Sequence, residues 1–447
     1  MKDPLEQEYE NLASEKKDAI DAMLAPPIGD DCFLLPIVDG PPGTGKTHTA
    51  TIGGGMYVRQ DPSKNKVIYT AFTNFALDRA KEELDKWFPP SSVVRLTPNP
   101  REKDWQRGRI GCDPLGGGLS YEDMRRVNRG SFLLCTPFML GRLKFFGQWK
   151  RAMVIFDEFS QIDVPTFFMV LGMIKGTAPR GIILFGDPLQ LPVVTTQEDL
   201  YPNIANYLGD LRRPEPHRLA IQFRMHDQIC QAVNRMRKEL ARTRVYPVSS
   251  GHELISAKSI RERGLEELGY AWEPEKARKY GSEMEQILDP SYPLVFIDTS
   301  EHGVEQQSPS KSWFNRDEAD LAARIVKVAS ESLKLPTKKP EFPKVITPYT
   351  AQSRLLKEKL PGENVLTVYK AQGREYPFVV ISMVRSNDRA DVGFLNQPYL
   401  RGQGYVALSR AMGKMIVLMA EDTFAPHPVF ETLVKMGGEK CMRLKLK

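Results

Sequence analysis

The residues with the clearest chemical potential form the glycine-rich segment Asp39-Gly40-Pro41-Pro42-Gly43-Thr44-Gly45-Lys46-Thr47. It follows the apolar run 33–38 and precedes a helix-compatible stretch, which is the setting of a phosphate cradle. Glycine lets backbone N–H groups approach the phosphates, and a lysine ammonium adds positive charge. The spacing predicts a P-loop for a nucleoside triphosphate, with contacts from Gly40, Pro41, Pro42, Gly43, Thr44, Gly45, Lys46, Thr47 and His48. A glycine-rich turn that binds nothing is the alternative.

An acidic pair, Asp157 and Glu158, follows the apolar stretch 154–156. The carboxyl ends of parallel strands are where α/β proteins bind ligands, so this pair is expected beside the phosphates. Asp157 can hold Mg²⁺ together with the Thr47 hydroxyl. Glu158 can orient or deprotonate the water that attacks the γ-phosphate. Alone, the pair could equally be a solvated loop, but the upstream P-loop favours the catalytic interpretation.

Three further polar residues lie in distinctive contexts. Gly186 and Pro188 predict a tight turn that directs Gln190 toward the nucleotide, where its amide can sense the γ-phosphate; a simple turn is the alternative. The carboxyl-terminal half has no second P-loop or acidic pair, but it carries Arg224 and Arg410 in turn-like or helix-start contexts. Arginines donated to a γ-phosphate accelerate its transfer by about 10³ to 10⁵. Surface ion pairs are the alternative role for each arginine.

The elements that must position these residues are short apolar strands alternating with helix-periodic segments, which indicates a parallel α/β fold. The predicted strands are 67–69, 93–96, 132–135, 153–156 and 182–185, then 294–297, 344–346, 365–368, 378–383 and 415–419. A proline-rich stretch at 212–216 predicts two domains, 1–215 and 216–447. Residues 97–130 and 241–290 interrupt the alternation, either as insertions that contact partners or as ordinary surface excursions.

Composition is that of a globular protein of more than one domain, with 447 residues, 41% hydrophobic and 26% charged residues. We find no apolar run long enough for a membrane span and no signal peptide, and we therefore expect a cytoplasmic protein. The formal charge of +6 suits a phosphate-rich partner but is weak support by itself. The five cysteines lack metal-ligand spacing, so we expect reduced thiols and no zinc; Cys135 reads as a buried side chain.

The strings GPPGTGKT, DEFSQ, GDPLQLP, QFRMH, TVYKAQGRE and YVALSRA occur in this order along the chain. In sequence and order they resemble the superfamily 1 helicases, and the stretches around 372–375, 384–387, 393–396 and 406–411 look most like the up-frameshift branch of that family. The resemblance runs from about residue 30 to about 420. It implies two RecA-like domains with ATP between them, and a monomeric motor that moves 5′ to 3′ on single-stranded nucleic acid.

Residue by residue, the resemblance assigns the ATP machinery to Lys46, Thr47, Asp157, Glu158, Gln190, Arg224 and Arg410. Phe223 matches an aromatic that stacks on the nucleotide base, and Glu375 matches a further nucleotide contact. Contacts to the nucleic acid are implied for Thr73, Asn74, Thr136 and Thr367. Small hydroxyl and amide groups suit this task because phosphates must be released in every cycle. Thr73 and Asn74 could instead cap the following helix.

Two departures limit the resemblance. The family has a glutamine that reads adenine upstream of the P-loop, whereas this chain has Glu15 or Lys16 there, which predicts use of GTP and other triphosphates besides ATP. The segment around Tyr369 and Ala371 is closer to RecD-like and viral helicases than to the up-frameshift pattern. The zinc-binding region, nuclease domain and large barrel found in some relatives have no counterpart in this sequence.

The leading hypothesis is therefore an ATP-driven translocase that unwinds duplexes. A nucleic-acid clamp or nucleoprotein remodeller, switched by ATP but without processive unwinding, would use the same residues. A P-loop enzyme acting on a small molecule is the third reading. The hypothesis covers DNA and RNA alike, because contacts to phosphates and stacked bases serve both.

Overall fold

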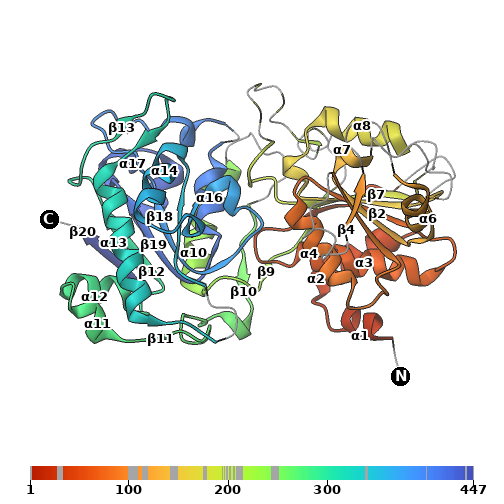
Figure 1. The fold of residues 1–447 in the computed structure, drawn as a ribbon, viewed down its shortest axis with the longest axis horizontal. Coiled ribbons are helices and arrows are strands. Elements are labelled where there is room, and N and C mark those ends of the chain that lie inside the picture. The colour runs from red at the N-terminus through yellow and green to blue at the C-terminus, as the bar shows by residue number, and fades with distance from the viewer. Residues whose placement is uncertain are drawn as a thin grey trace. The chain divides into compact units, whose positions relative to one another are not determined.

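The computed structural model describes residues 3–27, 34–98, 109–112, 119–140, 149–174, 179–193, 215–242, 251–337, 341–398, 400–437 and 440–445, with 195, 197, 200, 203, 204 and 207. These residues form two compact units. Unit 1 lies within residues 3–220, and unit 2 comprises the described residues from 221 onward together with Leu189–Leu191. Figure 1 labels many of the elements of both units.

Unit 1 is built on an eight-stranded sheet in the order β4-β3-β5-β2-β6-β7-β1-β8, in which every pairing is parallel. The strands are β1 Ile37–Asp39, β2 Val67–Ala71, β3 Val93–Pro98, β4 Arg109–Cys112, β5 Phe132–Cys135, β6 Met153–Asp157, β7 Gly181–Gly186 and β8 His217–Arg218. The P-loop follows β1, which lies between β7 and the edge strand β8. The parallel α/β fold expected from the sequence is confirmed here.

Helices cover both faces of this sheet (Figure 1). Successive strand residues such as Val154 and Ile155 enter separate hydrophobic clusters, because side chains alternate between faces. One face packs against α1 Pro4–Glu10, α2 Ser14–Leu24, α3 Lys46–Gln60 and α4 Asn74–Leu84. The other packs against α6 Tyr121–Arg129, α7 Pro137–Leu140 and α8 Val164–Ile174. Burial on both sides explains why the strands read as short continuous apolar runs.

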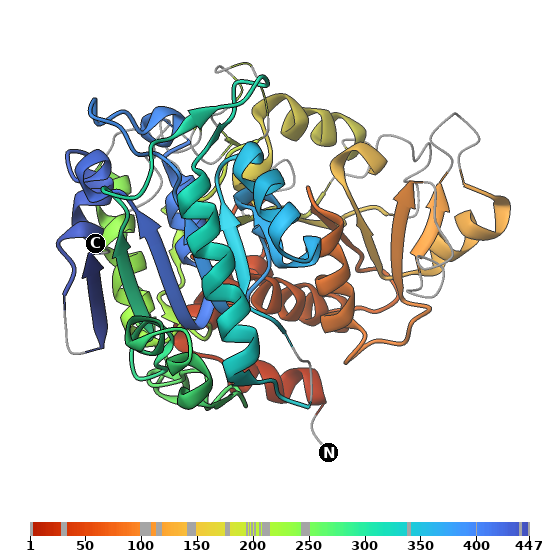
Figure 2. The same ribbon diagram turned by 60° about the vertical axis from the view of Figure 1, so that its left-hand side comes forward.

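Unit 2 has its own parallel sheet of six strands in the order β17-β16-β18-β19-β12-β20. The strands are β12 Leu294–Asp298, β16 Lys344–Thr347, β17 Val365–Thr367, β18 Tyr376–Ser382, β19 Ala411–Met419 and β20 Cys441–Lys445. Residue 368 was predicted to end a strand, but it begins a short helix after β17, so that expectation was wrong by one residue. Figure 2 shows the long helix α13 Arg316–Ser332 in front of the sheet.

The remaining elements of unit 2 are helices and short ladders around the sheet. The helices are α10 Asp227–Arg242, α11 Pro274–Arg278, α12 Ser282–Leu288, α14 Thr350–Lys359, α15 Val368–Ala371, α16 Gly402–Leu408, α17 Glu421–Phe424 and α18 Pro428–Val434. The ladders pair β9 Ile221–Gln222 with β10 Ile255–Ser256, β11 Ala271–Trp272 with β15 Leu333–Lys334, and β13 Gln306–Gln307 with β14 Trp313–Phe314. Helix α10 packs against α16 and α18.

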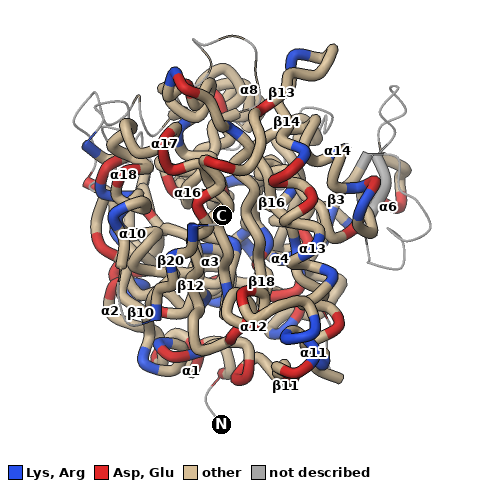
Figure 3. Tube along the Cα trace, turned by 90° about the vertical axis from the view of Figure 1, so that its left-hand side faces the viewer, with Lys and Arg blue, Asp and Glu red and all other residues tan. Residues whose placement is uncertain are grey.

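The two interruptions of the sequence pattern have different characters where the structure describes them. Of 97–130, residues 99–108 and 113–118 lie outside the described part; β4 and α6 are the elements that remain. Of 241–290, residues 243–250 lie outside it, but Leu265, Ala277 and Ile287 are buried in the core of unit 2. Ion pairs such as Arg278–Glu285 cover the outer side, and Figure 3 shows acidic and basic residues interspersed around α11 and α12.

Across the described ranges, no helix is both long enough and apolar enough to cross a membrane. Cys135 is fully buried in β5, which confirms its expected role as a small core side chain.

Candidate nucleotide and motor site

The predicted P-loop connects β1 to α3 in unit 1. Gly45 is the residue before the first turn of α3 and has φ 82° and ψ 32°, a left-handed conformation that favours glycine. Gly40 is required for a different reason: a Cβ there would lie 2.4 Å from Cγ of Lys46. The Gly40 N–H donates to the Gly186 carbonyl at 2.8 Å, which ties the loop to the end of β7. The start of α3 therefore presents backbone N–H groups in a geometry that suits phosphate binding.

Asp157 at the end of β6 joins three elements of unit 1. Its Oδ2 accepts hydrogen bonds from Thr47 Oγ1 at 3.0 Å and from Tyr69 Oη at 2.6 Å. Its Oδ1 accepts from the Glu158 backbone N–H at 2.9 Å. Burial, and then the charge of Asp157, raise the pKa of Tyr69 well above its usual range, so its phenol stays a donor. The structure thus brings Thr47 and Asp157 together and adds Tyr69, which the sequence did not single out.

Thr47 and Asp157 fit a magnesium ion, which prefers hard oxygen ligands such as hydroxyl and carboxylate groups. The two side chains already share a hydrogen bond and lie at the start of α3, where the phosphates of a nucleotide would lie. When bound, the ion would neutralise charge that develops on the phosphates.

Glu158 has an unusual backbone for a non-glycine residue, with φ 56° and ψ 48° in the left-handed region. This conformation carries an energetic cost, and such costs are concentrated at functional sites. It allows the chain to turn sharply from β6 into the short helix Phe159–Gln161. The chain therefore turns directly after Asp157, at the carboxyl end of β6, a place that suits a positioned base.

Two other predicted nucleotide contacts need qualification. The ring of His48 lies between two carboxylates, with Nδ1 2.9 Å from Glu83 Oε2 and Nε2 3.1 Å from Glu8 Oε1. Its contribution to a phosphate would therefore come from its backbone N–H.

Gln190 is 3% exposed and belongs to unit 2, whereas Pro188 belongs to unit 1. A turn follows at Pro188 and Leu189, and Gly186 before it lies so close to Phe159 that a Cβ there would be 2.6 Å from the ring.

The two predicted arginines meet inside unit 2, around Ser409. Arg224 Nη1 donates to the Ser409 carbonyl at 3.0 Å, and Arg410 Nη2 donates to Ser409 Oγ at 2.8 Å. Both arginine side chains are buried, with exposures of 7% and 1%. Arg224 Nε also donates to Glu375 Oε2 at 2.8 Å, which brings a further predicted residue into the cluster. Ser409 is the shared acceptor, a role that the sequence did not indicate.

Further hydrogen bonds hold Arg410. Arg410 Nε donates to the Val406 carbonyl at 2.9 Å and its Nη1 to the Arg374 carbonyl at 3.1 Å. The neighbouring Phe223, by contrast, is 44% exposed, and its carbonyl accepts from Arg263 Nη2 at 3.2 Å. An accessible aromatic ring next to a fixed arginine suits stacking on a nucleotide base.

The predicted nucleic-acid contacts lie where strands of the two sheets end. Thr73 follows β2, Thr136 follows β5 and Thr367 ends β17. Thr73 Oγ1 accepts from the Ala76 N–H at 3.2 Å, so it caps α4, as the alternative interpretation foresaw. Asn74 Oδ1 accepts from Arg95 Nη2 at 2.6 Å. Contact with phosphates stays a prediction for all four residues.

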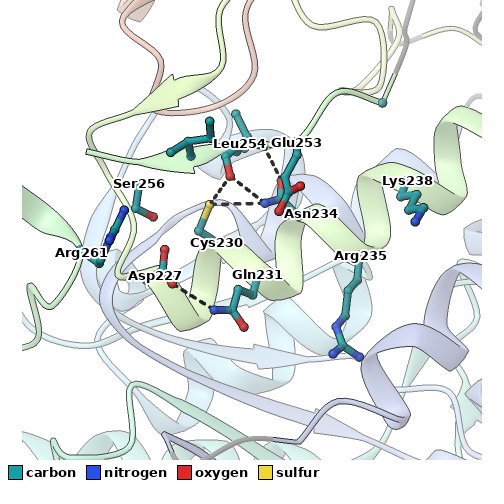
Figure 4. A pocket seen from close by; sticks show the side chains of 12 residues that line it. Asp227, Cys230, Gln231, Asn234, Arg235, Lys238, Glu253, Leu254, Ser256 and Arg261 are labelled. Atoms are coloured by element: carbon teal, nitrogen blue, oxygen red, sulfur yellow. Dashed lines mark hydrogen bonds between the residues drawn. The ribbon is translucent and has the colours of Figure 1, made fainter. Parts of the chain in front are cut away.

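Away from these motifs, unit 2 has a hollow of about 510 Å³ along α10 (Figure 4). Asn234 joins two sides of its wall. Its Nδ2 donates to the Leu254 carbonyl and its Oδ1 accepts from the Leu254 N–H, both at 2.8 Å. Burial raises the pKa of the Cys230 thiol at this wall to about 12, so it stays protonated. These bonds hold the segment that leads to β10. The polar side chain of Asn234 therefore has a structural role at this wall.

Known proteins provide an independent comparison. Family models described as AAA domain match residues 34–196 and 204–422. The chain is 24% identical to the ATP-dependent helicase upf1 of Schizosaccharomyces pombe, over 96% of this chain and 47% of that protein. It is 26% identical to an uncharacterized ATP-dependent helicase of Methanocaldococcus jannaschii, over 90% of this chain and 67% of that protein.

A third relative is the DNA replication ATP-dependent helicase/nuclease DNA2 of Saccharomyces cerevisiae, 27% identical over 96% of this chain and 27% of that protein. The chain thus spans about half or less of the length of several relatives that it matches. The two AAA domain matches adjoin one another, and each includes the motifs of one half of the sequence. Both halves of the chain thus match AAA domain models, and the order of the motifs along them is similar to that of the superfamily 1 helicases.

Proposed function

We propose that this protein is an ATP-dependent helicase or translocase that moves 5′ to 3′ along single-stranded DNA or RNA without sequence preference. The observation that carries the proposal is the division of catalytic groups between two α/β units. Unit 1 holds the P-loop with Thr47 and Asp157, and unit 2 holds the buried pair Arg224 and Arg410 around Ser409. A small-molecule P-loop enzyme would not need this division.

In the proposed reaction, Lys46 and the N–H groups at the start of α3 bind the phosphates, and Thr47 and Asp157 hold Mg²⁺. Glu158 orients the attacking water and accepts its proton, while Gln190 senses the γ-phosphate. Arg224 and Arg410 stabilise the charge that develops on the transferred group. Hydrolysis then depends on both units, so a cycle of their association can be coupled to movement.

Energy supply is not the obstacle to unwinding, because each base-pair step opposes the motor by only about 1.4 kcal/mol on average. Directional movement needs grip and release in each cycle. Thr73, Asn74, Thr136 and Thr367 would contact the backbone through small polar groups, and affinity should fall steeply with salt. We further propose that GTP and other triphosphates support movement, since the expected glutamine is replaced.

The test is strand displacement on duplexes that carry either a 5′ or a 3′ single-stranded overhang, each built from DNA and from RNA. The proposal expects ATP-dependent displacement from the 5′ overhang. Turnover stimulated by nucleic acid without displacement would favour the clamp. ATP turnover that does not respond to nucleic acid would contradict both the helicase and the clamp, and would favour a small-molecule substrate.

A further inference from the structure

Lys16 is a buried lysine beside the P-loop that the sequence comparison left without a role. It lies in the first turns of α2, and only 5% of its surface is exposed. A Cβ built on Gly45 would lie 3.0 Å from Lys16 Nζ and 3.7 Å from Lys16 Cε. The ammonium group therefore lies against the residue that caps the start of α3.

Packing between α2 and α3 fixes this position. Two turns further along, Met23 lies so close to Gly53 that a Cβ there would meet its Cε at 2.6 Å. Ile20 also faces Gly53 at 3.5 Å from the same point. The glycine allows the two helices to approach closely, and the approach carries the Lys16 side chain to Gly45.

The neighbouring Glu15 points to a different place. Its Oε2 accepts a hydrogen bond from the Ala220 N–H at 2.9 Å, just beyond β8. Of the two residues that stand where a base-reading glutamine was expected, Glu15 is therefore engaged with the backbone near the sheet edge. Lys16 is the one that reaches the phosphate loop.

The surroundings of Lys16 favour an anion. The start of α3 carries the positive end of the helix dipole, and Lys46 adds a second ammonium group at the same turn. Burial lowers the pKa of Lys16, while Glu15 and Glu8 act in the opposite direction. A phosphate at this position would offset the burial of positive charge.

We propose that Lys16 binds the phosphate chain of the nucleotide as a second lysine beside Lys46, so that this stretch recognises phosphate instead of the base. The inference rests on the proposed nucleotide site and assigns its ligand class as polyphosphates, whatever base they carry. It also explains the proposed use of several triphosphates. The affinity lost with the base-reading glutamine would be restored by contacts to the phosphates.

The decisive probe is inorganic tripolyphosphate, which has phosphates and no base. Binding of tripolyphosphate, ATP and GTP is measured by titration calorimetry for the wild type, Lys16→Met and Lys17→Met. Lys17 is the matched control, because its Nζ donates to the Glu10 carbonyl at 2.6 Å on the exposed side of the same helix. Thermal melting of each variant confirms that it is folded.

We expect Lys16→Met to weaken all three ligands by a similar factor of about 10 to 100, the value of one hydrogen bond to a charged group. Lys17→Met should leave all three affinities within about twofold of the wild type. Unchanged tripolyphosphate affinity in Lys16→Met, or a loss confined to one base, would overturn the inference. Equal losses in both variants would overturn it as well, by showing a general effect on α2.

Two further variants separate this inference from the proposed nucleotide site. Lys16→Arg keeps the positive charge and should retain tripolyphosphate affinity within a few-fold even if Lys16→Met does not fold; loss as large as that of a neutral side chain would contradict the inference. Lys46→Ala should weaken ATP binding severely. If Lys46→Ala binds ATP normally, the P-loop assignment itself fails, whereas normal binding by Lys16→Met alone removes only the role of Lys16.

Discussion

At the scale of single residues, Asp157 and Glu158 have different surroundings although they are adjacent. Asp157 is fully buried and accepts from Thr47 and Tyr69, so its carboxylate is fixed. Glu158 follows it with a left-handed backbone, at the point where the chain leaves β6. One carboxylate is suited to holding an ion and the other to handling a proton.

Glu158→Gln should therefore separate binding from hydrolysis. The amide keeps the size of the side chain but cannot accept the proton, so turnover should fall by about 10² to 10⁴ while ATP affinity stays within a few-fold. Single-turnover hydrolysis and equilibrium nucleotide binding measure the two effects. Glu82→Gln, on the exposed side of α4, is the control that should behave as the wild type. Normal hydrolysis by Glu158→Gln would remove Glu158 as the base.

Tyr69→Phe tests whether the phenol positions Asp157. Removing its hydroxyl leaves the buried carboxylate with one donor fewer, which should lower the free energy of unfolding of unit 1 by about 1 to 3 kcal/mol. If the role of Tyr69 is purely structural, the loss of stability should be the only effect. A positioning role also predicts that more Mg²⁺ is needed for half-maximal turnover, measured by titrating Mg²⁺ at saturating ATP. An unchanged Mg²⁺ requirement would leave Tyr69 as a core residue only.

At the scale of elements, the loop after β18 shows how a buried carboxylate stabilises a strained segment. Val384 has φ 74°, which is costly for a β-branched residue. Glu318 on α13 accepts from the Val384 N–H at 2.9 Å and from Ser382 Oγ at 2.6 Å. Burial raises the pKa of Glu318 to about 7 despite these bonds.

This pKa predicts a pH dependence of unit 2. Between about pH 4.5 and 7 the folded state keeps the Glu318 proton and the unfolded state releases it, so stability should fall as pH rises, by about 1.4 kcal/mol per pH unit. Glu318→Gln should remove this slope, because the amide does not titrate. Urea unfolding at several pH values measures it, with the exposed Glu363→Gln as control. An unchanged slope in Glu318→Gln would contradict the assignment.

Most elements could be predicted from sequence because parallel strands buried on both faces appear as apolar runs. The run at 132–135 became β5 without change, and 153–156 gained only Asp157. β20 escaped prediction because basic residues such as Arg443 interrupt its apolar pattern. Side-chain partners were harder: Tyr69 and Asp157 are 88 residues apart, and Arg224 and Ser409 are 185 apart. No local pattern encodes such pairs.

At the scale of the whole molecule, the arginines of unit 2 should matter to the proposed reaction, in which unit 1 binds the nucleotide. Arg410→Ala should slow hydrolysis by about 10³ to 10⁵ while ATP affinity is kept. It also removes bonds to Ser409 and Val406 from a buried site, so the stability of unit 2 should fall by a few kcal/mol. Arg410→Lys limits that cost and should still hydrolyse slowly, since a lysine lacks the planar fork of donors.

Turnover and stability must therefore be measured on the same Arg410 variants. Hydrolysis at the wild-type rate by folded Arg410→Lys would argue that Arg410 supports only the structure of unit 2. Loss of ATP binding in either variant would contradict the proposal that unit 1 binds ATP without the help of Arg410.

The central claim is that a nucleotide site divided between two units drives movement along one strand. Its most direct test compares strand displacement on 5′-overhang and 3′-overhang duplexes, with ATP, by the wild type and Lys46→Ala. We predict displacement by the wild type from the 5′ overhang only and none by Lys46→Ala. Displacement without nucleotide, or equal displacement by Lys46→Ala, would contradict the claim.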